Sequence, residues 1–337
     1  FGTRPNSVND SLSRVNMIEN IGWAFRAYNG EDANGNGILD IGEDTNLNGK
    51  LDRYRLPEPP VPPKMKVIPT DRSVTIYWDK RAESSVDPIS REQDFEGYRL
   101  YRSNSGNELT SSSGSSESLI LMAEFDSTGN ASGTNGGFES RGNYEKLTTP
   151  VTFDGDTATK YYYKYRVDNL LNGWQYLFAV TSFDEGDSVR NISSLESSRS
   201  QNLARVIPGT PPNDKFQNGK IGVYPNPYYG TALWDGSSER DKKIYFYNLP
   251  SRCEIRIYTL AGETVDVIRH QSDTYRGEDV RWFQTFSGGG NVQLAGGEHA
   301  WDMISQRDQS LASGLYIFSV KDQNSGDIQV GKFVIIK

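Results

Sequence analysis

Short segments in which apolar and polar residues alternate recur along most of the chain. Alternation with a period of two is the pattern of a β-strand that buries one face. Clusters of Gly, Asn, Asp, Ser and Pro, which favour turns, separate these segments. The clearest strand segments are residues 74–78, 97–102, 174–181, 254–258, 264–268, 316–320 and 333–336. The pattern therefore predicts an all-β fold built from β-sandwiches.

One stretch near the start has a different period. Within residues 8–28, Leu12, Val15 and Ile18 are followed by Trp23 and Phe25, which form a rough apolar stripe at helical spacing. Asp10 and Ser11 are suitable residues for the start of a helix. This stretch predicts one short helix.

Proline-rich and polar stretches divide the chain into segments. We expect an N-terminal helix and loop segment at 1–56, a stiff proline connector at 57–63, and a β-sandwich at 64–205. A second linker at 206–217 then precedes a C-terminal sandwich at 218–337.

The segment 64–205 resembles a fibronectin type III domain. The strand that ends at Trp78, the strand with Tyr98 and Tyr101, and Leu170 six residues before Tyr176 match that family's tryptophan strand and tyrosine corner. The segment departs from the family in length. Two polar stretches, 103–118 and 127–142, are expected to form long loops that the usual module lacks.

The C-terminal segment resembles the immunoglobulin-like sorting domain of type IX secretion substrates in the Bacteroidota. Its blocks follow the family's order: residues 223–227 read VYPNP, 244–250 read IYFYNLP, 254–263 read EIRIYTLAGE, 314–318 read GLYIF and 331–337 read GKFVIIK. The resemblance implies export across the outer membrane to the cell surface or medium. It also implies the secretion machinery as a partner, and it leaves open whether the tail is removed.

The most specific chemical motif lies in the N-terminal segment. Starting at Asp32, oxygen-bearing side chains fall at loop positions 1, 3, 5, 9 and 12, with glycine at position 6 and a backbone carbonyl at position 7, which is the spacing of a calcium loop. A second copy follows at once, but Arg55 stands at its twelfth position. It therefore binds more weakly or borrows a ligand from its neighbour. The predicted Ca²⁺ ligands are Asp32, Asn34, Asn36, Ile38, Asp40 and Glu43, then Asp44, Asn46, Asn48, Lys50 and Asp52.

The alternative for this motif is a polar turn region that binds no metal. Two consecutive matches are far less expected by chance than one, so we favour calcium. The loops lack the paired long helices of a calcium sensor, and they resemble calcium-loop repeats of bacterial extracellular proteins. Such sites bind at about 10⁻⁴–10⁻³ M, which suits extracellular calcium. We expect a structural role, the stiffening of a segment too polar to build a core.

Charge and apolar content exclude two classes of partner. The net charge is −8, with 36 basic residues and no basic run, so we expect no nucleic-acid surface. No apolar run is long enough to span a bilayer. The single cysteine, Cys253, is in phase with Ile255 and Ile257 and is expected to be buried and inert.

Residues for catalysis are few. The histidines are His270 and His299, expected at the surface or partly packed, and the sequence has no nucleophile elbow, zinc-protease motif or Walker loop. The chain begins at Phe1 without a methionine or signal peptide, so we expect a mature or truncated product.

The favoured function is therefore a non-catalytic, calcium-stabilised part of an exported structural protein. If the protein assembles, further copies of itself are its partners. One alternative is an appendage of a secreted hydrolase whose enzyme domain lies upstream. Another is a glycan-binding module that uses the aromatic side chains of Tyr228, Tyr229 and Trp234.

Overall fold

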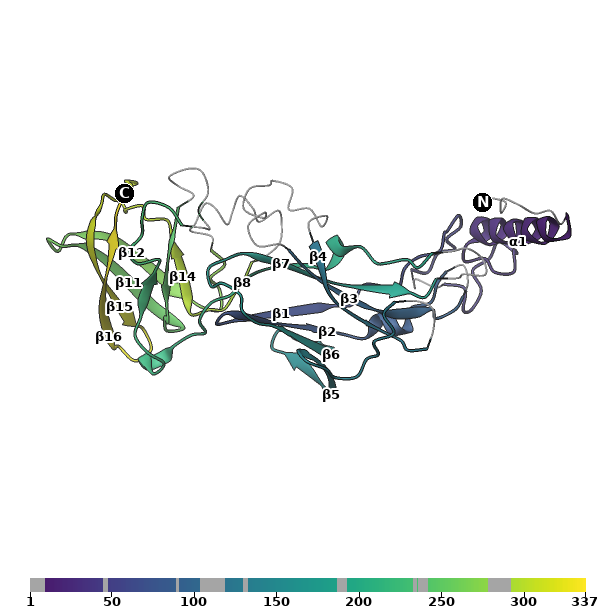
Figure 1. Cartoon of the computed structure of the whole chain (residues 1–337), viewed down its shortest axis with the longest axis horizontal. Coiled ribbons are helices and arrows are strands. Elements are labelled where there is room, and N and C mark those ends of the chain that lie inside the picture. Colours follow the sequence, from purple (N-terminus) through teal and green to yellow (C-terminus); the bar gives the residue numbers. More distant parts are fainter. Residues whose placement is uncertain are drawn as a thin grey trace.

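The computed structural model describes residues 10–44, 48–88, 91–103, 119–129, 133–186, 193–232, 235, 242–277 and 292–337. Its parts lie in a row: the C-terminal sandwich at one end, a larger sandwich in the middle, and the N-terminal helix at the other end (Figure 1). The fold is all-β, with several antiparallel sheets of the fibronectin type III and immunoglobulin kind and one α-helix in the described part of the chain. The predicted fold class is confirmed.

The helix α1 spans Asp10–Asn29, close to the predicted 8–28. It ends at Gly30, whose positive φ of 60° and N–H bond to the carbonyl of Arg26 (2.8 Å) form a left-handed cap. A Cβ at Gly30 would lie 2.3 Å from the backbone oxygen of Asp52, so only glycine fits there. Several apolar side chains of α1 are exposed, including Ile18 and Phe25. None of the described helices is long and apolar enough to cross a membrane.

Two sheets face each other in the first sandwich. One has the order β1-β2-β6-β5, and the other has the order β13-β8-β7-β3-β4, in which β13 comes from the C-terminal part of the chain. The strands are β1 Met65–Thr70, β2 Ser73–Trp78, β3 Phe95–Ser103, β4 Leu119–Asp126, β5 Tyr144–Phe153, β6 Asp156–Val167, β7 Tyr176–Asp184 and β8 Leu203–Ile207, with 3₁₀ turns η1 Arg81–Ser84 and η3 Arg199–Asn202.

The two family landmarks of this sandwich are in place. Trp78 is fully buried between the sheets and stacks on Tyr163 with ring centroids 5.7 Å apart. The hydroxyl of Tyr176 accepts a hydrogen bond from the backbone N–H of Leu171 at 3.0 Å, which is the tyrosine corner that the spacing predicts. β7 starts at Tyr176, two residues later than the predicted strand, because Trp174 and Gln175 follow a turn at Asn172 and Gly173 without pairing in the sheet.

The C-terminal sandwich packs a sheet of order β14-β10-β9 on one of order β12-β11-β15-β16. Its core holds Trp301, whose indole N–H bonds to Asp266 Oδ2 at 2.8 Å, and Cys253, which is buried as predicted. The elements of this part of the chain are η4 Asp214–Phe216, β9 Gly222–Tyr224, β10 Ile244–Tyr247, β11 Arg252–Thr259, β12 Thr264–Gln271, β13 Gln293–Leu294, β14 Glu298–Trp301, β15 Gly314–Asp322 and β16 Ile328–Ile335, of which β13 pairs in the first sandwich.

The two sandwiches are joined by more than a linker. Val206 and Ile207, which the sequence places in the second linker, are the last residues of β8 and pair in parallel with β13. Tyr245 of β10 is buried in the same apolar cluster as the first sandwich's core. Apolar burial and strand pairing therefore continue across the junction, which a loose connection would not allow.

Candidate metal centre

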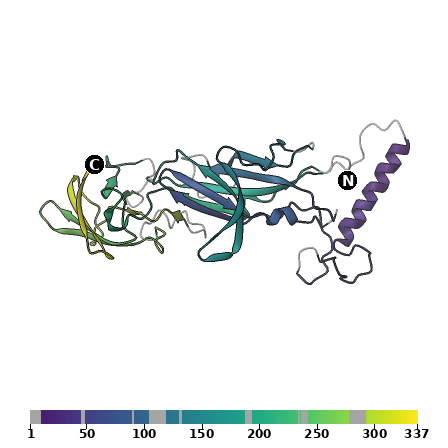
Figure 2. The ribbon, with the colours of Figure 1, turned by 90° about the horizontal axis from the view of Figure 1, so that it is seen from below.

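The first predicted calcium loop follows α1 directly and folds around its own carboxylates. Asp32 Oδ2, at the first loop position, accepts a hydrogen bond of 2.9 Å from the N–H of Gly37, at the sixth. Glu43, the twelfth residue, accepts the N–H of Ala33 and of Asp40, each at 2.9 Å. The positive φ of Gly37, 78°, makes the sharp turn at this point. Figure 2 shows the loop segment at the C-terminal end of α1, beside the end of the first sandwich.

The amide nitrogens of two side chains in the loop point to the same carboxylate. Asn34 and Asn36 each donate from Nδ2 to Asp40 Oδ2 at 2.8 Å, while their Oδ1 atoms accept backbone N–H groups two residues ahead. Five predicted ligand side chains are therefore bonded to one another or to the loop backbone. The sixth ligand, Ile38, would contribute its backbone carbonyl.

One oxygen in this loop lacks the partner that its burial demands. Asp32 is fully buried, and its Oδ1 accepts no hydrogen bond. Its Oδ2 accepts from Gly37 and from Arg53 Nη2, 2.8 Å away. A buried carboxylate oxygen without a donor costs about 1–3 kcal/mol or more, and a cation at this position would relieve that cost. The donor set, carboxylates with amides and a carbonyl, is that of Ca²⁺.

The second loop repeats the hydrogen bonds of the first loop twelve residues later. Asp44 Oδ2 accepts from Gly49 N–H (2.8 Å), Asn48 Oδ1 accepts from Lys50 N–H (2.7 Å), and Asn48 Nδ2 donates to Asp52 Oδ2 (2.8 Å). Asn46, a predicted ligand of this loop, lies outside the described residues. Within each loop, the described ligand side chains are thus hydrogen-bonded to one another or to the loop backbone.

The two predicted calcium sites are not built from carboxylates alone. Among the described residues, no three His, Cys, Asp or Glu side chains are grouped as metal ligands. The loops instead mix carboxylates with amides and backbone carbonyls. Such a mixture suits a hard ion with six to eight oxygen ligands and is unsuited to zinc or copper.

Two arginine side chains connect the loops to the first sandwich. The sequence alone did not indicate this role. Arg91 donates to the carbonyl of Glu31 at 2.5 Å and to that of Glu43 at 3.4 Å. Arg55 pairs with Glu31 at 3.0 Å and with Glu58 at 2.7 Å, and the N–H of Glu58 bonds to Asp87 Oδ2 at 2.8 Å. The loop segment is therefore attached to the sandwich through charged groups at both of its ends.

Asp87 belongs to an acidic group at the end of the sandwich that faces the loops. Burial, followed by the charges of Asp184 and Asp87, raises the pKa of Asp94 to about 6. Arg91, whose guanidinium bonds to loop carbonyls, lies between Asp87 and Asp94 in the chain.

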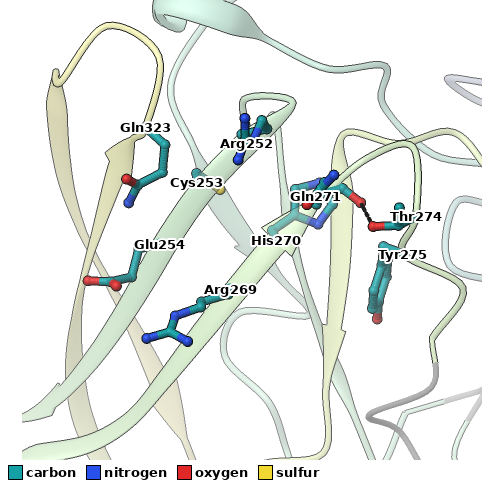
Figure 3. Close-up of a pocket in the computed structure, with 9 residues that line it drawn as sticks. All are labelled: Arg252, Cys253, Glu254, Arg269, His270, Gln271, Thr274, Tyr275 and Gln323. Atoms are coloured by element: carbon teal, nitrogen blue, oxygen red, sulfur yellow. Dashed lines mark hydrogen bonds between the residues drawn. The ribbon is translucent and has the colours of Figure 1, made fainter.

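A second candidate is a groove of about 410 Å³ on the C-terminal sandwich (Figure 3). Its lining comes from the ends of β11 and β12 and the turns beside them: Arg252, Cys253, Glu254, Arg269, His270, Gln271, Thr274, Tyr275 and Gln323. Burial and the charge of Asp322 raise the pKa of the Cys253 thiol to about 12. Because the thiolate is the reactive form, this cysteine is a poor nucleophile.

The two histidines are buried, which differs from the surface or partly packed positions that the sequence suggests. His270 Nδ1 lies 3.1 Å from His299 Nδ1, and His270 Nε2 lies 2.8 Å from the carbonyl of Gly296. A carbonyl only accepts, so Nε2 of His270 carries a proton. Tyr275 stacks on His299 with centroids 4.0 Å apart. Both histidine rings are buried, and His270 also contributes to the lining of the groove.

The two described tyrosines proposed for glycan contact do not share a surface. Tyr228 is fully buried, and its hydroxyl donates to Asp235 Oδ2 at 2.6 Å, so its suggested role in surface contact is wrong. Tyr229, the next residue, is 66% exposed. Trp234 lies outside the described residues.

Comparisons with known proteins assign the chain to no family. No family model matches the chain, and no curated protein matches it. Among solved structures it is similar to PorZ, a surface component of the type IX secretion system of Porphyromonas gingivalis, at 19% identity and a TM-score of 0.22 over 35% of this chain and 11% of that one. It is also similar to latent PorU of the same bacterium, at 11% identity and a TM-score of 0.20 over 89% of this chain and 21% of that one.

A third similar structure is the FN1–FN3 region of chicken CNTN1, at 11% identity and a TM-score of 0.20 over 83% of this chain and 68% of that one. The chain spans about a tenth of PorZ and a fifth of PorU.

Proposed function

We propose that the chain is a non-catalytic part of an exported structural protein at the cell surface or outside the cell. In this proposal, calcium stiffens the N-terminal loops, and the C-terminal sandwich directs export through the type IX secretion machinery. The observation that carries the calcium part is Asp32 Oδ1, a fully buried carboxylate oxygen without a donor in a loop of oxygen-bearing side chains.

Support for the export part comes from the sequence of the tail. The blocks VYPNP, IYFYNLP and GLYIF lie at the start, middle and end of residues 221–337, in the order of the sorting-domain family. The first precedes β10, the second covers that strand, and the third opens β15. The last strand, β16, is paired with β15 along its whole length, so the tail is a folded unit and not a trailing peptide.

The export proposal is tested in a Bacteroidota host. The full chain, placed behind a general secretory signal peptide, is expressed in a strain with the type IX machinery and in a strain without it. We expect the protein on the surface or in the medium of the first strain and in the periplasm of the second. Equal surface exposure in both strains would reject the export route.

The calcium proposal is tested on the full chain by titration with CaCl₂ after chelation. We expect binding at about 10⁻⁴–10⁻³ M, as for other extracellular calcium modules. The paired variant Asp32→Asn with Asp44→Asn replaces the first carboxylate of each loop with a neutral amide and should weaken binding at both loops by at least about tenfold, since ligand charge sets affinity in calcium loops. The matched control Asp154→Asn changes an exposed aspartate in the turn between β5 and β6 and should bind as the parent does. No binding by the parent chain would reject the proposal.

Assembly is tested by electron microscopy and sedimentation of the same samples. If the sandwiches build a surface structure, fibres or sheets should form in calcium and loosen when it is chelated. A strictly monomeric particle in both conditions would count against assembly.

The non-catalytic appendage of a secreted hydrolase is the second candidate. The same row of sandwiches could serve as a spacer, and only the coding sequence upstream of Phe1 separates the two proposals. A catalytic domain there would favour the appendage. Glycan binding has less support, because Tyr228, one of its three aromatic side chains, is buried.

A further inference from the structure

The two calcium loops differ at one loop position in their sequences. The twelfth residue of the first loop is Glu43, whereas the twelfth residue of the second is Arg55. The twelfth residue normally supplies a bidentate carboxylate, so the second loop lacks its strongest ligand by sequence. An arginine cannot replace it, since its guanidinium only donates.

The structure places a different carboxylate at the second loop. In the first loop, Glu43 Oε2 accepts the N–H of Asp40, the ninth residue, at 2.9 Å. In the second loop, the N–H of the ninth residue, Asp52, bonds to Glu31 Oε2 at 3.1 Å. Glu31 thus makes with the second loop the same contact that Glu43 makes with the first, although it lies just before the first loop.

Other contacts hold Glu31 in this place. Its backbone N–H donates to the carbonyl of Asp52 at 2.8 Å, so backbone and side chain both contact the same residue. Gly30 allows this approach, because a Cβ there would lie 2.3 Å from the same carbonyl oxygen. The side chain of Glu31 is fully buried, so it is held in one position and cannot swing into solvent.

Arg55 contacts the other carboxylate oxygen. Its Nη1 lies 3.0 Å from Glu31 Oε1, while its Nη2 lies 2.7 Å from Glu58 Oε1. Arg55, at the twelfth position of the second loop, therefore orients the carboxylate of Glu31, which lies where a twelfth-position carboxylate would act. This explains why an arginine is compatible with a calcium loop at that position.

We propose that Glu31 is the acidic ligand that completes the second calcium site, with Arg55 as its positioning residue. The site then takes a divalent oxygen-seeking cation through Asp44, Asn48, Asp52, the carbonyl of Lys50 and Glu31. This inference rests on the proposed calcium function.

The arrangement also links the two loops in both directions. Glu31, before the first loop, closes the second, and Arg53, beyond the ninth position of the second loop, lies 2.8 Å from Asp32 Oδ2 of the first.

The test measures the binding of radioactive calcium to the full chain by equilibrium dialysis. The parent should bind two ions. Glu31→Gln should keep one ion at the first loop and weaken the second by at least about tenfold, since ligand charge sets affinity in calcium loops. Glu43→Gln should affect the first loop more strongly. Glu58→Gln, which changes the other partner of Arg55, serves as the matched control and should keep both sites within about threefold.

The outcomes separate the inference from the calcium proposal. If the parent binds no calcium, the proposed function itself is rejected. If the parent binds two ions and Glu31→Gln also binds two with unchanged affinity, the role of Glu31 is rejected while calcium binding stands. If Glu31→Gln loses both ions, Glu31 supports the fold of the whole segment, and its assignment as a ligand of the second loop is wrong.

Discussion

The hydroxyl of Tyr245, on β10 of the C-terminal sandwich, donates a hydrogen bond of 3.0 Å to the carbonyl of Gly173 in the first sandwich. Tyr245 also stacks on Tyr224 with ring centroids 5.1 Å apart. Gly173 has a φ of 74°, and a Cβ there would lie 2.9 Å from the ring of Tyr245. The two sandwiches therefore meet at a contact that needs a glycine on one side and an aromatic pair on the other.

Gly173→Ala should loosen this contact. The added methyl group meets both a strained backbone and the rings of Tyr245 and Tyr224, so we expect a loss of about 2–4 kcal/mol in the free energy of unfolding. Gly155→Ala is the control, because Gly155 has a similar φ of 83° but nothing within 4 Å of its Cβ position. It should lose only about 1–2 kcal/mol. Chemical denaturation of the full chain measures both, and equal losses would show that the ring contacts do not matter.

Glu298 should make the stability of this junction depend on pH. Its side chain accepts hydrogen bonds from the hydroxyl of Tyr224 and, at 2.8 Å, from the N–H of Thr210. Burial raises its pKa from 4.5 to about 7, so the folded state favours the protonated form. Its contribution is fully present below pH 4.5 and is lost as the pH rises through 7, by about 1–3 kcal/mol.

Glu298→Gln should remove this part of the pH dependence, because the amide stays neutral. Glu263→Gln, which changes an exposed glutamate, should keep the dependence of the parent. Urea unfolding of the full chain between pH 4.5 and 7 measures the difference between the two variants. Parallel curves for Glu298→Gln and the parent would contradict a protonated carboxyl at the junction.

Tyr176→Phe should destabilise the first sandwich. The change removes the hydroxyl that accepts the N–H of Leu171 at 3.0 Å and leaves the aromatic packing in place. We expect a loss of about 0.5–1.5 kcal/mol, the net contribution of a hydrogen bond to stability. Tyr229→Phe, at an exposed tyrosine, is the matched control and should change the unfolding midpoint little. Equal stability of both variants would rule out a stabilising role for the tyrosine corner.

Calcium should protect the segment between α1 and the first sandwich from proteases. Binding to the folded loops lowers the population of open forms by mass action, by about 1–2 kcal/mol at roughly ten times the dissociation constant. Limited proteolysis of the full chain, followed by mass spectrometry, should show cleavage within residues 30–55 in chelator and slower cleavage there in calcium. The loops of the two sandwiches serve as internal controls. Equal rates in both conditions would indicate that calcium does not stiffen the segment.

Much of the fold could be predicted from the sequence, because local patterns of apolar and polar residues determine the strands. The alternation around Ile255 and Ile257 places β11 correctly, and its phase puts Cys253 in the core, as the structure confirms. The spacing of Leu170 and Tyr176 identifies the tyrosine corner, since that motif is local along the chain. Helix α1 was also predicted, with bounds within two residues.

The calcium loops were equally visible in the sequence, because their ligands follow one another at fixed spacing. Their hydrogen bonds repeat with the period of the motif. That these loops bind calcium stays a prediction. The role of Glu31 could not be read from the sequence, because twenty-one residues separate it from Asp52, and nothing local couples the two.

Burial of side chains in loops and at the junction was decided by the tertiary structure. Tyr228 and Tyr229 are neighbours in the sequence, yet the first is in the core and the second is in solvent. The parallel pairing of β13 with β8 joins segments that are more than eighty residues apart, and it extends the first sandwich with a strand from the second part of the chain. The alternation of apolar and polar residues and the spacing of the loop ligands are local features, so they can be read from the sequence. Contacts between distant residues depend on the tertiary structure. The packing of the sheets decided how the two sandwiches meet, and the fold of the loop segment decided which carboxylate lies at the second loop.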